Sequence, residues 1–186
     1  REKMALDTTR FFTFRNMDAL LQNFPWKKKT KSAIEERLYE ESEKASKKPS
    51  AKNYSEGKTK MKVLIVSDTH GRHTSLDRAL KEAGDIDMFI HLGDVEGGED
   101  YIEAVVECEK HMIRGNNDFF SYLPAEEEFW IGKKKEFITH GHSYYVSMET
   151  EQIREEGVAR NADIVMFGHT HRPYFEDQNG VVVLNP

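Results

Sequence analysis

Five short apolar stretches between residues 61 and 167 are each followed closely by side chains that can bind a metal ion. The stretches cover residues 61–66, 88–92, 111–113, 137–139 and 164–167, and their composition predicts strands buried on both faces. The segments that follow are Asp68-Thr69-His70, Gly93-Asp94, Gly115-Asn116-Asn117-Asp118, His140-Gly141-His142 and Gly168-His169-Thr170-His171. This recurrence restricts the chain to a fold in which the ends of five strands can meet.

Segments with helical periodicity separate these strands. Apolar residues recur at helical spacing at 76, 79, 80 and 83 and at 101, 102, 105 and 106, and a third helix is predicted around residues 149–161. The alternation of strands and helices indicates an α/β fold built on a layered sheet. Near the end, residues 174–176 and 181–184 flank Asn179-Gly180, a pair typical of a β-hairpin turn. Residues 61–186 are therefore predicted to form one domain.

The chemistry of the strand ends favours a metal site. In open α/β sheets, ligands bind outside the carboxyl ends of the strands, so five such loops can converge on one point. A histidine beside one strand is more often structural than a ligand, but five loops together make a metal the better explanation. Asp, His and Asn supply oxygen and imidazole nitrogen without thiolate, a set that suits Mn²⁺, Fe or Zn²⁺.

Residues 1–60 have a different character. They hold 15 of the 27 Lys and Arg residues and 9 of the 33 Asp and Glu residues, so residues 1–60 carry about +6 and residues 61–186 about −12. We expect a polar N-terminal extension, partly helical over residues 32–48 or disordered, that ends in a linker rich in Ser, Lys and Gly. Docking of its aromatic clusters on the domain or on a partner is the alternative.

Composition also excludes several classes of protein. A single cysteine, Cys108, rules out an internal disulfide and a Cys-rich zinc cluster. No apolar run approaches the ~18 residues of a membrane span, and no signal peptide is recognisable, so a soluble cytoplasmic protein is expected. The acidic balance of residues 61–186 disfavours nucleic acid as a partner, other than as a source of phosphodiester.

The ordered set D-x-H, G-D, G-N-x-D, H-G-H and G-H-T-H closely resembles the calcineurin-like metallophosphoesterases, and within them the small YfcE/MJ0936-type phosphodiesterases. The resemblance covers residues 61–186 and implies a four-layer α/β/β/α sandwich with paired central sheets. It also implies two divalent metal ions, with Mn as the first choice and Ni, Fe, Zn or Mg as alternatives. Asp68, His70 and His171 would hold one ion, Asn116, His140 and His169 the other, and Asp94 would bridge both.

The implied function is hydrolysis of small phosphodiesters by a hydroxide that bridges the two ions, with Asp94 and Asn116 as catalytic residues. Many relatives place His directly after the ligand Asn, whereas this chain has Asn117, so the source of the leaving-group proton is open. His142 is the predicted substitute donor. Asn117 and Arg172 are predicted to contact the substrate, with an exposed salt bridge as the alternative role for Arg172.

The remaining expectations concern the end of the chain and the rival functions. The sequence ends at Asn185-Pro186, where the resemblance leads one to expect Gly-Ser and further strands, so a sheet edge open to homo-oligomer formation is predicted. A phosphomonoesterase or protein phosphatase with the same site is the nearest rival. A non-catalytic scaffold, as in a retromer subunit of this fold, is another, although all seven ligand positions are filled here. His73, His91 and His111 are predicted to be surface or packing residues.

Overall fold

The computed structural model describes residues 11–14, as backbone only, and residues 61–186. The predicted helix and linker within residues 1–60 therefore lie outside the described residues. The only described part of this segment is one short strand, β1 (Phe11–Phe14), so the predicted alternative of aromatic docking is not described beyond it. This strand lies at one edge of the first sheet.

The first sheet has the strand order β1-β2-β3-β4. Its strands β2 (Val63–Val66), β3 (Met88–His91) and β4 (Glu109–Met112) are parallel, and their register pairs Val66 with His91 and His91 with Met112. The carboxyl ends of these strands consequently lie side by side. Helices α3 (His73–Ala83) and α4 (Glu99–Val105) pack on one face of the sheet through a buried cluster that includes Leu64, Phe89 and Ile102.

The second sheet has the order β5-β6-β7-β9-β8. Its strands are β5 (Glu126–Ile131), β6 (Lys134–Thr139), β7 (Ile164–Met166), β8 (Tyr174–Gln178) and β9 (Val181–Asn185). A short 3₁₀ helix, His142–Tyr144, follows β6, and helix α5 (Glu151–Ala159) packs on the outer face of the sheet through Phe137, Ile153 and Val165.

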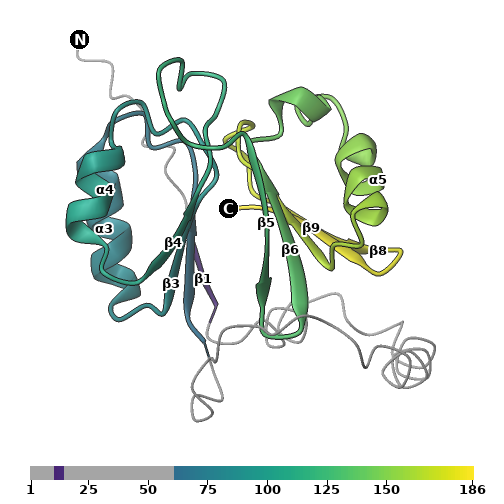
Figure 1. Ribbon diagram of the computed structural model, residues 1–186, viewed down its shortest axis with the longest axis horizontal. Helices are drawn as coiled ribbons and strands as arrows, with labels where there is room; N and C mark the ends of the chain where they lie inside the picture. Colours follow the sequence, from purple (N-terminus) through teal and green to yellow (C-terminus); the bar gives the residue numbers. More distant parts are fainter. Residues whose placement is uncertain (1–10, 15–60) are drawn as a thin grey trace. The chain divides into compact units, whose positions relative to one another are not determined.

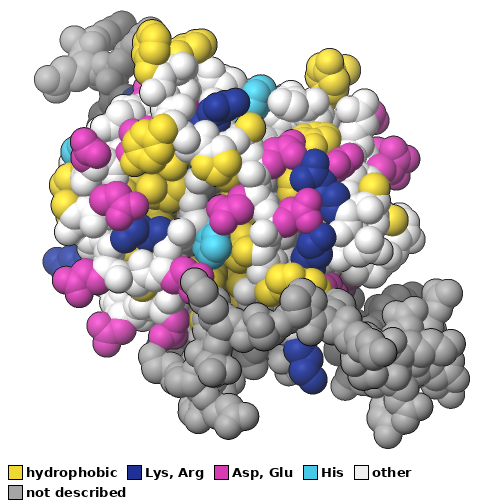
Figure 2. All heavy atoms as spheres, viewed as in Figure 1, with side chains coloured by type: hydrophobic (Ala, Val, Ile, Leu, Met, Phe, Trp, Pro, Cys, Tyr) yellow, Lys and Arg dark blue, Asp and Glu magenta, His cyan; other side chains and the backbone are white. Residues whose placement is uncertain are grey.

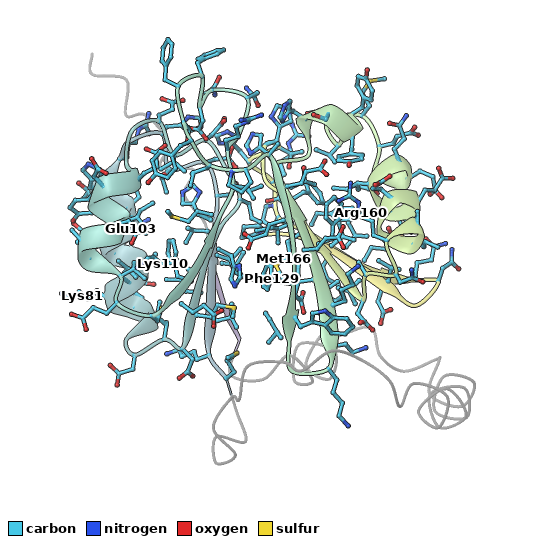
Figure 3. All side chains as sticks on the ribbon, in the orientation of Figure 1. Lys81, Glu103, Lys110, Phe129, Arg160 and Met166 are labelled. Atoms are coloured by element: carbon cyan, nitrogen blue, oxygen red, sulfur yellow. The ribbon has the colours of Figure 1, made fainter. Side chains whose placement is uncertain are left out.

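The two sheets face each other and carry helices on their outer faces, as Figure 1 shows for α3 and α4 on one side and α5 on the other. Alternation along a strand points Leu64 and Val66 at the helices, so Ile65 faces the opposite sheet and is fully buried there. Phe129 and Met166 are labelled between the sheets in Figure 3. The predicted four-layer α/β/β/α sandwich is confirmed.

The predicted hairpin is confirmed as well. Strands β8 and β9 pair antiparallel, and Asn179 and Gly180 between them have φ angles of 55° and 81°. Two positive φ angles are what a type I′ turn requires, and Asn-Gly adopts them at the lowest cost. Strand β9 lies between β7 and β8, so the last strand of the sequence lies inside the sheet rather than at its edge.

Strand β5 was missed by sequence reasoning because it begins with three glutamates and contains only one buried residue, Ile131. The structure explains its charges. Arg160 at the end of α5 donates to Glu126 Oε2 at 2.7 Å and to Glu128 Oε1 at 3.1 Å, while its guanidinium lies 4.2 Å from the centre of the Phe137 ring. Figure 3 shows Arg160 between α5 and the sheet, and Figure 2 shows basic side chains flanked by acidic ones on this face.

Within the described residues, no helix combines the length and the apolar character that crossing a bilayer requires.

Candidate metal centre

The loops that follow β2, β3, β4, β6 and β7 converge although they come from two different sheets. Backbone hydrogen bonds join the first two loops, from Asp68 N to Gly93 O at 3.0 Å and from His70 N to Asp94 O at 2.9 Å. In the second sheet, Gly168 N donates to His140 O at 3.1 Å. The predicted convergence on one point is therefore achieved by facing sheets rather than along one sheet edge.

The backbone at this point is strained in a way that is typical of functional sites. Most residues with positive φ angles that are not glycine lie in these loops, namely Asp68, His70, Asp94, Glu96, His169 and His171. Each such conformation costs of order 1–3 kcal/mol and persists only where the surrounding structure enforces it. The strain places these side chains where ordinary loop conformations would not.

The first group of ligand atoms comes from Asp68, His70 and His171, whose donor atoms lie within 4.8 Å of one another. Asp68 Oδ2 accepts hydrogen bonds from Ser67 Oγ at 2.6 Å and from His169 N at 3.1 Å. Asp68 Oδ1 is buried, has no hydrogen-bond partner, and lies 3.4 Å from His171 Nε2. A buried carboxylate oxygen without a donor is costly, and a divalent cation would satisfy it.

The second group contains Asp68, Asp94 and His140. The Nδ1–H of fully buried His140 donates to Leu92 O at 2.7 Å, which places Nε2 3.1 Å from Asn116 Oδ1 and 3.5 Å from Asp94 Oδ1. Such a hydrogen bond to the far nitrogen is how a metal-binding histidine is usually oriented. The residues present therefore fit a cation at this position too.

Burial alone would raise the pKa of Asp94, yet its interactions with His140 and with the backbone N–H of Asn117 lower that pKa to about 2. Asp94 is thus a carboxylate across the whole physiological pH range. Both of its oxygens are held, because Asn117 donates from its backbone N to Oδ1 at 2.9 Å and from its side-chain Nδ2 to Oδ2 at 2.7 Å. In this structure Asn117, predicted to contact the substrate, orients the predicted bridging ligand.

The other predicted site residues lie around this centre. The ring centroid of His169 is 5.2 Å from that of His140, and the ring centroid of His142 lies 5.5 Å from His140 and 6.2 Å from His169. His169 does not join the carboxylates in any of the tight ligand groups found among the described residues. Arg172 and His169 line a separate cavity of about 670 Å³ beside the centre.

The three histidines that were predicted to be surface or packing residues make packing contacts. His91 is fully buried, accepts from Gly93 N at 3.2 Å and contacts Thr69 Oγ1 at 3.0 Å, and burial lowers its pKa to about 4. His73 stacks on Tyr101 and His111 stacks on Phe129. Neutral His91 thus ties the loop after β2 to the loop after β3.

Sequence reasoning did not single out Glu96 and assigned Asp118 no role of its own. Glu96 Oε1 lies 2.6 Å from His70 Nδ1, and Glu96 forms a third group of ligand atoms with His70 and Asp94. Asp118 is buried and accepts three backbone hydrogen bonds, from Val95, Glu96 and Gly115, at 3.1, 2.6 and 2.7 Å. The motif G-N-x-D contains Asp118, but only the structure shows that it holds two site loops together.

Close packing explains why residue 115, in the loop after β4, is a glycine. A Cβ atom on Gly115 would lie 2.1 Å from Asp94 Oδ1 and 2.5 Å from Asp94 N. Any side chain at this position would displace the Asp94 carboxylate from its place between Asn117 and His140.

Replacing Asp118 by asparagine should lower the free energy of unfolding by about 2–4 kcal/mol, because an amide NH₂ would face a backbone N–H donor whichever way it is turned. Urea unfolding at neutral pH measures the change. Asp177→Asn, an exposed position on β8, is the matched control and should change stability by less than about 0.5 kcal/mol. An equally small change in Asp118→Asn would mean that the three hydrogen bonds contribute little.

Comparison with known proteins agrees with this geometry. A family model for the calcineurin-like phosphoesterase superfamily domain matches residues 61–186, and the chain belongs to this family. It is 31% identical over 130 residues to a probable metallophosphoesterase of Methanocaldococcus jannaschii, covering 68% of this chain and 67% of the relative. It is 28% identical over 147 residues to a phosphodiesterase of the same organism, covering 68% and 82% of the two chains.

Solved structures agree as well. Vps29 of Entamoeba histolytica in complex with Zn²⁺ is similar with a TM-score of 0.56 and 27% identity, over 67% of this chain and 72% of that chain. The resemblance inferred from the five motifs is therefore confirmed. Family membership, together with the candidate metal ligands, points to a hydrolase of phosphoric esters.

Proposed function

We propose that this protein is a metal-dependent phosphodiesterase whose site is the convergence of the five loops. The observation that carries the proposal is the orphaned Asp68 Oδ1, which is buried, has no donor, and shares its surroundings with His171 and His140. A metal cation placed among these groups would compensate the buried charge without a change in the fold.

The proposed assignment of ligands keeps the sequence prediction. Asp68, His70 and His171 hold one divalent ion, Asn116, His140 and His169 hold a second, and Asp94 is shared. When bound, such ions supply Lewis-acid stabilisation of the phosphoryl group and activate water as the nucleophile. Mn²⁺ is the proposed native ion, because carboxylate, amide and imidazole ligands together suit hard to borderline cations.

The chain's own residues supply the positioning. Asn117 holds Asp94 from two sides, and Leu92 O orients the His140 ring. Asp118 clamps the loops that carry Asp94 and Asn116. These hydrogen bonds fix the ligand atoms before any substrate arrives, so little reorganisation is required during the reaction.

Two observations support diester over monoester substrates. The relative from M. jannaschii that is 28% identical is itself a phosphodiesterase. In addition, Asn117 stands where many family members place a histidine, and its side-chain amide donates a hydrogen bond to Asp94. A diester carries one negative charge at neutral pH, so it makes a smaller demand on cationic groups than a monoester dianion.

The test is a matrix of metals and substrates on the full chain. With Mn²⁺ added, bis(p-nitrophenyl) phosphate should be hydrolysed with at least a ~30-fold higher kcat/KM than p-nitrophenyl phosphate. A reversed preference would assign a phosphomonoesterase. Absence of turnover with every divalent metal, despite metal binding seen by calorimetry, would support a non-catalytic scaffold and end the proposal.

His142 is the proposed donor of the leaving-group proton. Its side chain is solvent-accessible, and its ring lies beside those of His140 and His169. General acid catalysis typically contributes about 10²–10⁴-fold, and alkoxide leaving groups need it whereas aryloxides do not. His142→Ala should therefore slow alkyl esters by at least ~100-fold and aryl esters by less than ~5-fold.

A leaving-group series on wild type and His142→Ala measures this difference. Tyr145→Phe, a neighbouring exposed position, is the control and should follow the wild-type dependence. A dependence on leaving-group basicity that is the same in wild type and His142→Ala would assign protonation to another group.

A further inference from the structure

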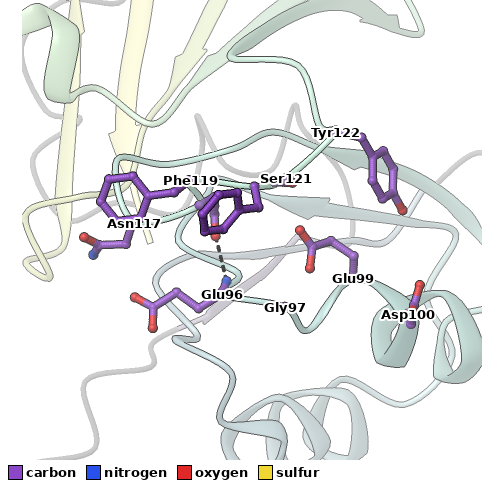
Figure 4. A pocket seen from close by; sticks show the side chains of 10 residues that line it. Glu96, Gly97, Glu99, Asp100, Asn117, Phe119, Ser121 and Tyr122 are labelled. Carbon is purple, nitrogen blue, oxygen red and sulfur yellow. Dashed lines mark hydrogen bonds between the residues drawn. The ribbon is translucent and has the colours of Figure 1, made fainter.

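A cavity of about 360 Å³ opens beside the candidate metal centre, under the loop of residues 119–122. Figure 4 shows the side chains that line it. The residues that matter here are Glu96, Glu99, Asp100, Asn117, Phe119 and Tyr122. None of the proposed metal ligands lines this cavity, so its chemistry requires a separate explanation.

Aromatic side chains form one wall. Phe119, Phe120 and Tyr122 have exposed fractions of 81%, 102% and 75%, although the loop that carries them is anchored. Asp118 holds its start, Ser121 N donates to Asp118 O at 3.2 Å, and Leu123 N donates to Ser121 Oγ at 3.2 Å. Three aromatic rings held in solvent by an ordered loop are typical of a recognition surface.

Carboxylates form the opposite wall. Glu96, Glu99 and Asp100 line the cavity, and no Lys or Arg lies among its lining residues. Glu99 is 8% exposed, has no ion pair or hydrogen bond to its carboxylate within residues 61–186, and lies on the cavity wall facing Tyr122 in Figure 4. A carboxylate without an ion pair on the cavity wall, with Glu96 and Asp100 beside it, makes the cavity negative, so a cation in the cavity would be attracted there.

Two residues that line the cavity also contact proposed metal ligands. Asn117 Nδ2 donates to Asp94 Oδ2 at 2.7 Å, and Glu96 Oε1 contacts His70 Nδ1 at 2.6 Å. The cavity therefore lies next to the place where the phosphoryl group of a substrate would be held.

We propose that this cavity binds the ammonium-bearing arm of a soluble phosphodiester, of the choline or ethanolamine type. The inference rests on the proposed phosphodiesterase function and names its substrate class. Aromatic faces attract alkylammonium groups through the ring quadrupole, and carboxylates add charge complementarity. A second phosphate would be repelled by the same carboxylates, and a bare divalent ion would gain no ligand from the rings.

The first test measures binding without catalysis. Choline chloride is titrated into the full chain in the presence of Mg²⁺, and amide shifts are followed by NMR. Choline should shift residues 96–100 and 117–122 with a Kd on the order of 1–10 mM, and its neutral isostere 3,3-dimethylbutanol should bind at least ~10-fold more weakly. Equal affinity for the two compounds, or shifts elsewhere, would overturn the proposal.

Variants test the contributions of the aromatic wall and of the acidic wall to choline binding separately. Tyr122→Leu and Glu99→Gln should each weaken choline binding by at least ~5-fold, and Tyr122 is too exposed for its replacement to affect folding. Glu103→Gln on the same helix is the matched control, since its partner is Lys110 outside the cavity, and it should bind as wild type does. Loss of choline binding in Glu103→Gln alone would assign the effect to net charge and refute the site.

The second test links binding to turnover. The kcat/KM for p-nitrophenyl phosphocholine should exceed that for p-nitrophenyl 3,3-dimethylbutyl phosphate by at least ~10-fold, equivalent to about 1.4 kcal/mol. Choline binding without turnover of either ester would refute the phosphodiesterase and keep the cavity assignment. Equal turnover of the two esters without choline binding would refute the cavity assignment and keep the phosphodiesterase. Co-sedimentation with phosphatidylcholine vesicles would assign the cavity to a lipid surface and overturn the soluble substrate.

Discussion

Replacing Asp94 by alanine should lower kcat/KM for a phosphodiester by at least ~10⁴-fold, about 5.5 kcal/mol of transition-state stabilisation, and should lower the bound metal to less than one ion per chain. The reason is that the proposed assignment shares this one carboxylate between the two ions. Its Oδ1 lies 3.5 Å from His140 Nε2, and Asp94 also belongs to the ligand group with His70 and Glu96. Exhaustive EDTA dialysis should have the same effect on wild type, and Mn²⁺ should restore it.

Two variants separate loss of a ligand from loss of structure. Asp94→Ala removes the acceptors of both Asn117 hydrogen bonds, whereas Asp94→Asn keeps the shape and loses the charge. If the charge is what matters, Asp94→Asn should lose activity almost as far while its circular dichroism spectrum stays that of the folded wild type. Asp177→Ala, an exposed acid on β8, is the control and should retain full turnover. Near-normal turnover with two bound ions in Asp94→Ala would contradict the shared role.

Wild-type protein should become less stable between about pH 4.5 and pH 8, and Glu136→Gln should remove most of that dependence. Glu136 is fully buried on β6, opposite Phe129 and beside Ile164, and neither of its carboxyl oxygens has a hydrogen-bond partner. Burial, with a smaller contribution from Asp163, raises the pKa of Glu136 from 4.5 to about 8. The side chain is therefore a neutral acid in the fold at pH 7.

The sign of the effect follows from where the proton is bound. Below pH 4.5 the group is protonated in both states, so burial carries no charge penalty. Between pH 4.5 and 8 the unfolded chain releases the proton while the folded chain keeps it, and stability falls with rising pH. The total loss is on the order of 4 kcal/mol, an upper bound because water and local rearrangement would relieve it.

Urea unfolding of wild type and Glu136→Gln from pH 5 to 9 measures this difference directly. The variant should be the more stable protein at pH 8 and should show a flatter profile. Glu155→Gln, an exposed position on α5, is the control, and its free energy of unfolding should depend on pH as that of wild type does. If Glu136→Gln also runs parallel to wild type, the carboxyl of Glu136 is ionised in the fold and has a partner.

Several elements could be predicted from the sequence because their signals are local. Residues 63–66 are all apolar and form a strand with every residue buried, and Asn179-Gly180 forms the turn that its backbone preferences dictate. The ligand loops follow the same logic, since each places its Asp, Asn or His residues directly after a strand. The spacing of these loops also carried the family resemblance.

Other features depended on packing between distant segments. His70 and His171 are 101 residues apart in the sequence and stack with ring centroids 5.3 Å apart. Sequence alone does not say which strands share a sheet, and the five strands with ligand loops divide between two. The glutamates of β5 gave no strand signal in the sequence, and their partner Arg160 belongs to a different layer of the fold.

The sequence by itself determined which residues could bind metal and the order in which they occur, because these depend on residue type and on short-range alternation of strand and helix. Only the tertiary structure decided burial and neutralisation of charge. Glu136, Glu99 and Asp118 are all acids in the sequence, yet one is buried without a partner, one lines a cavity and one holds three backbone amides. Their differences arise from what long-range packing brings next to each carboxylate, which no local pattern specifies.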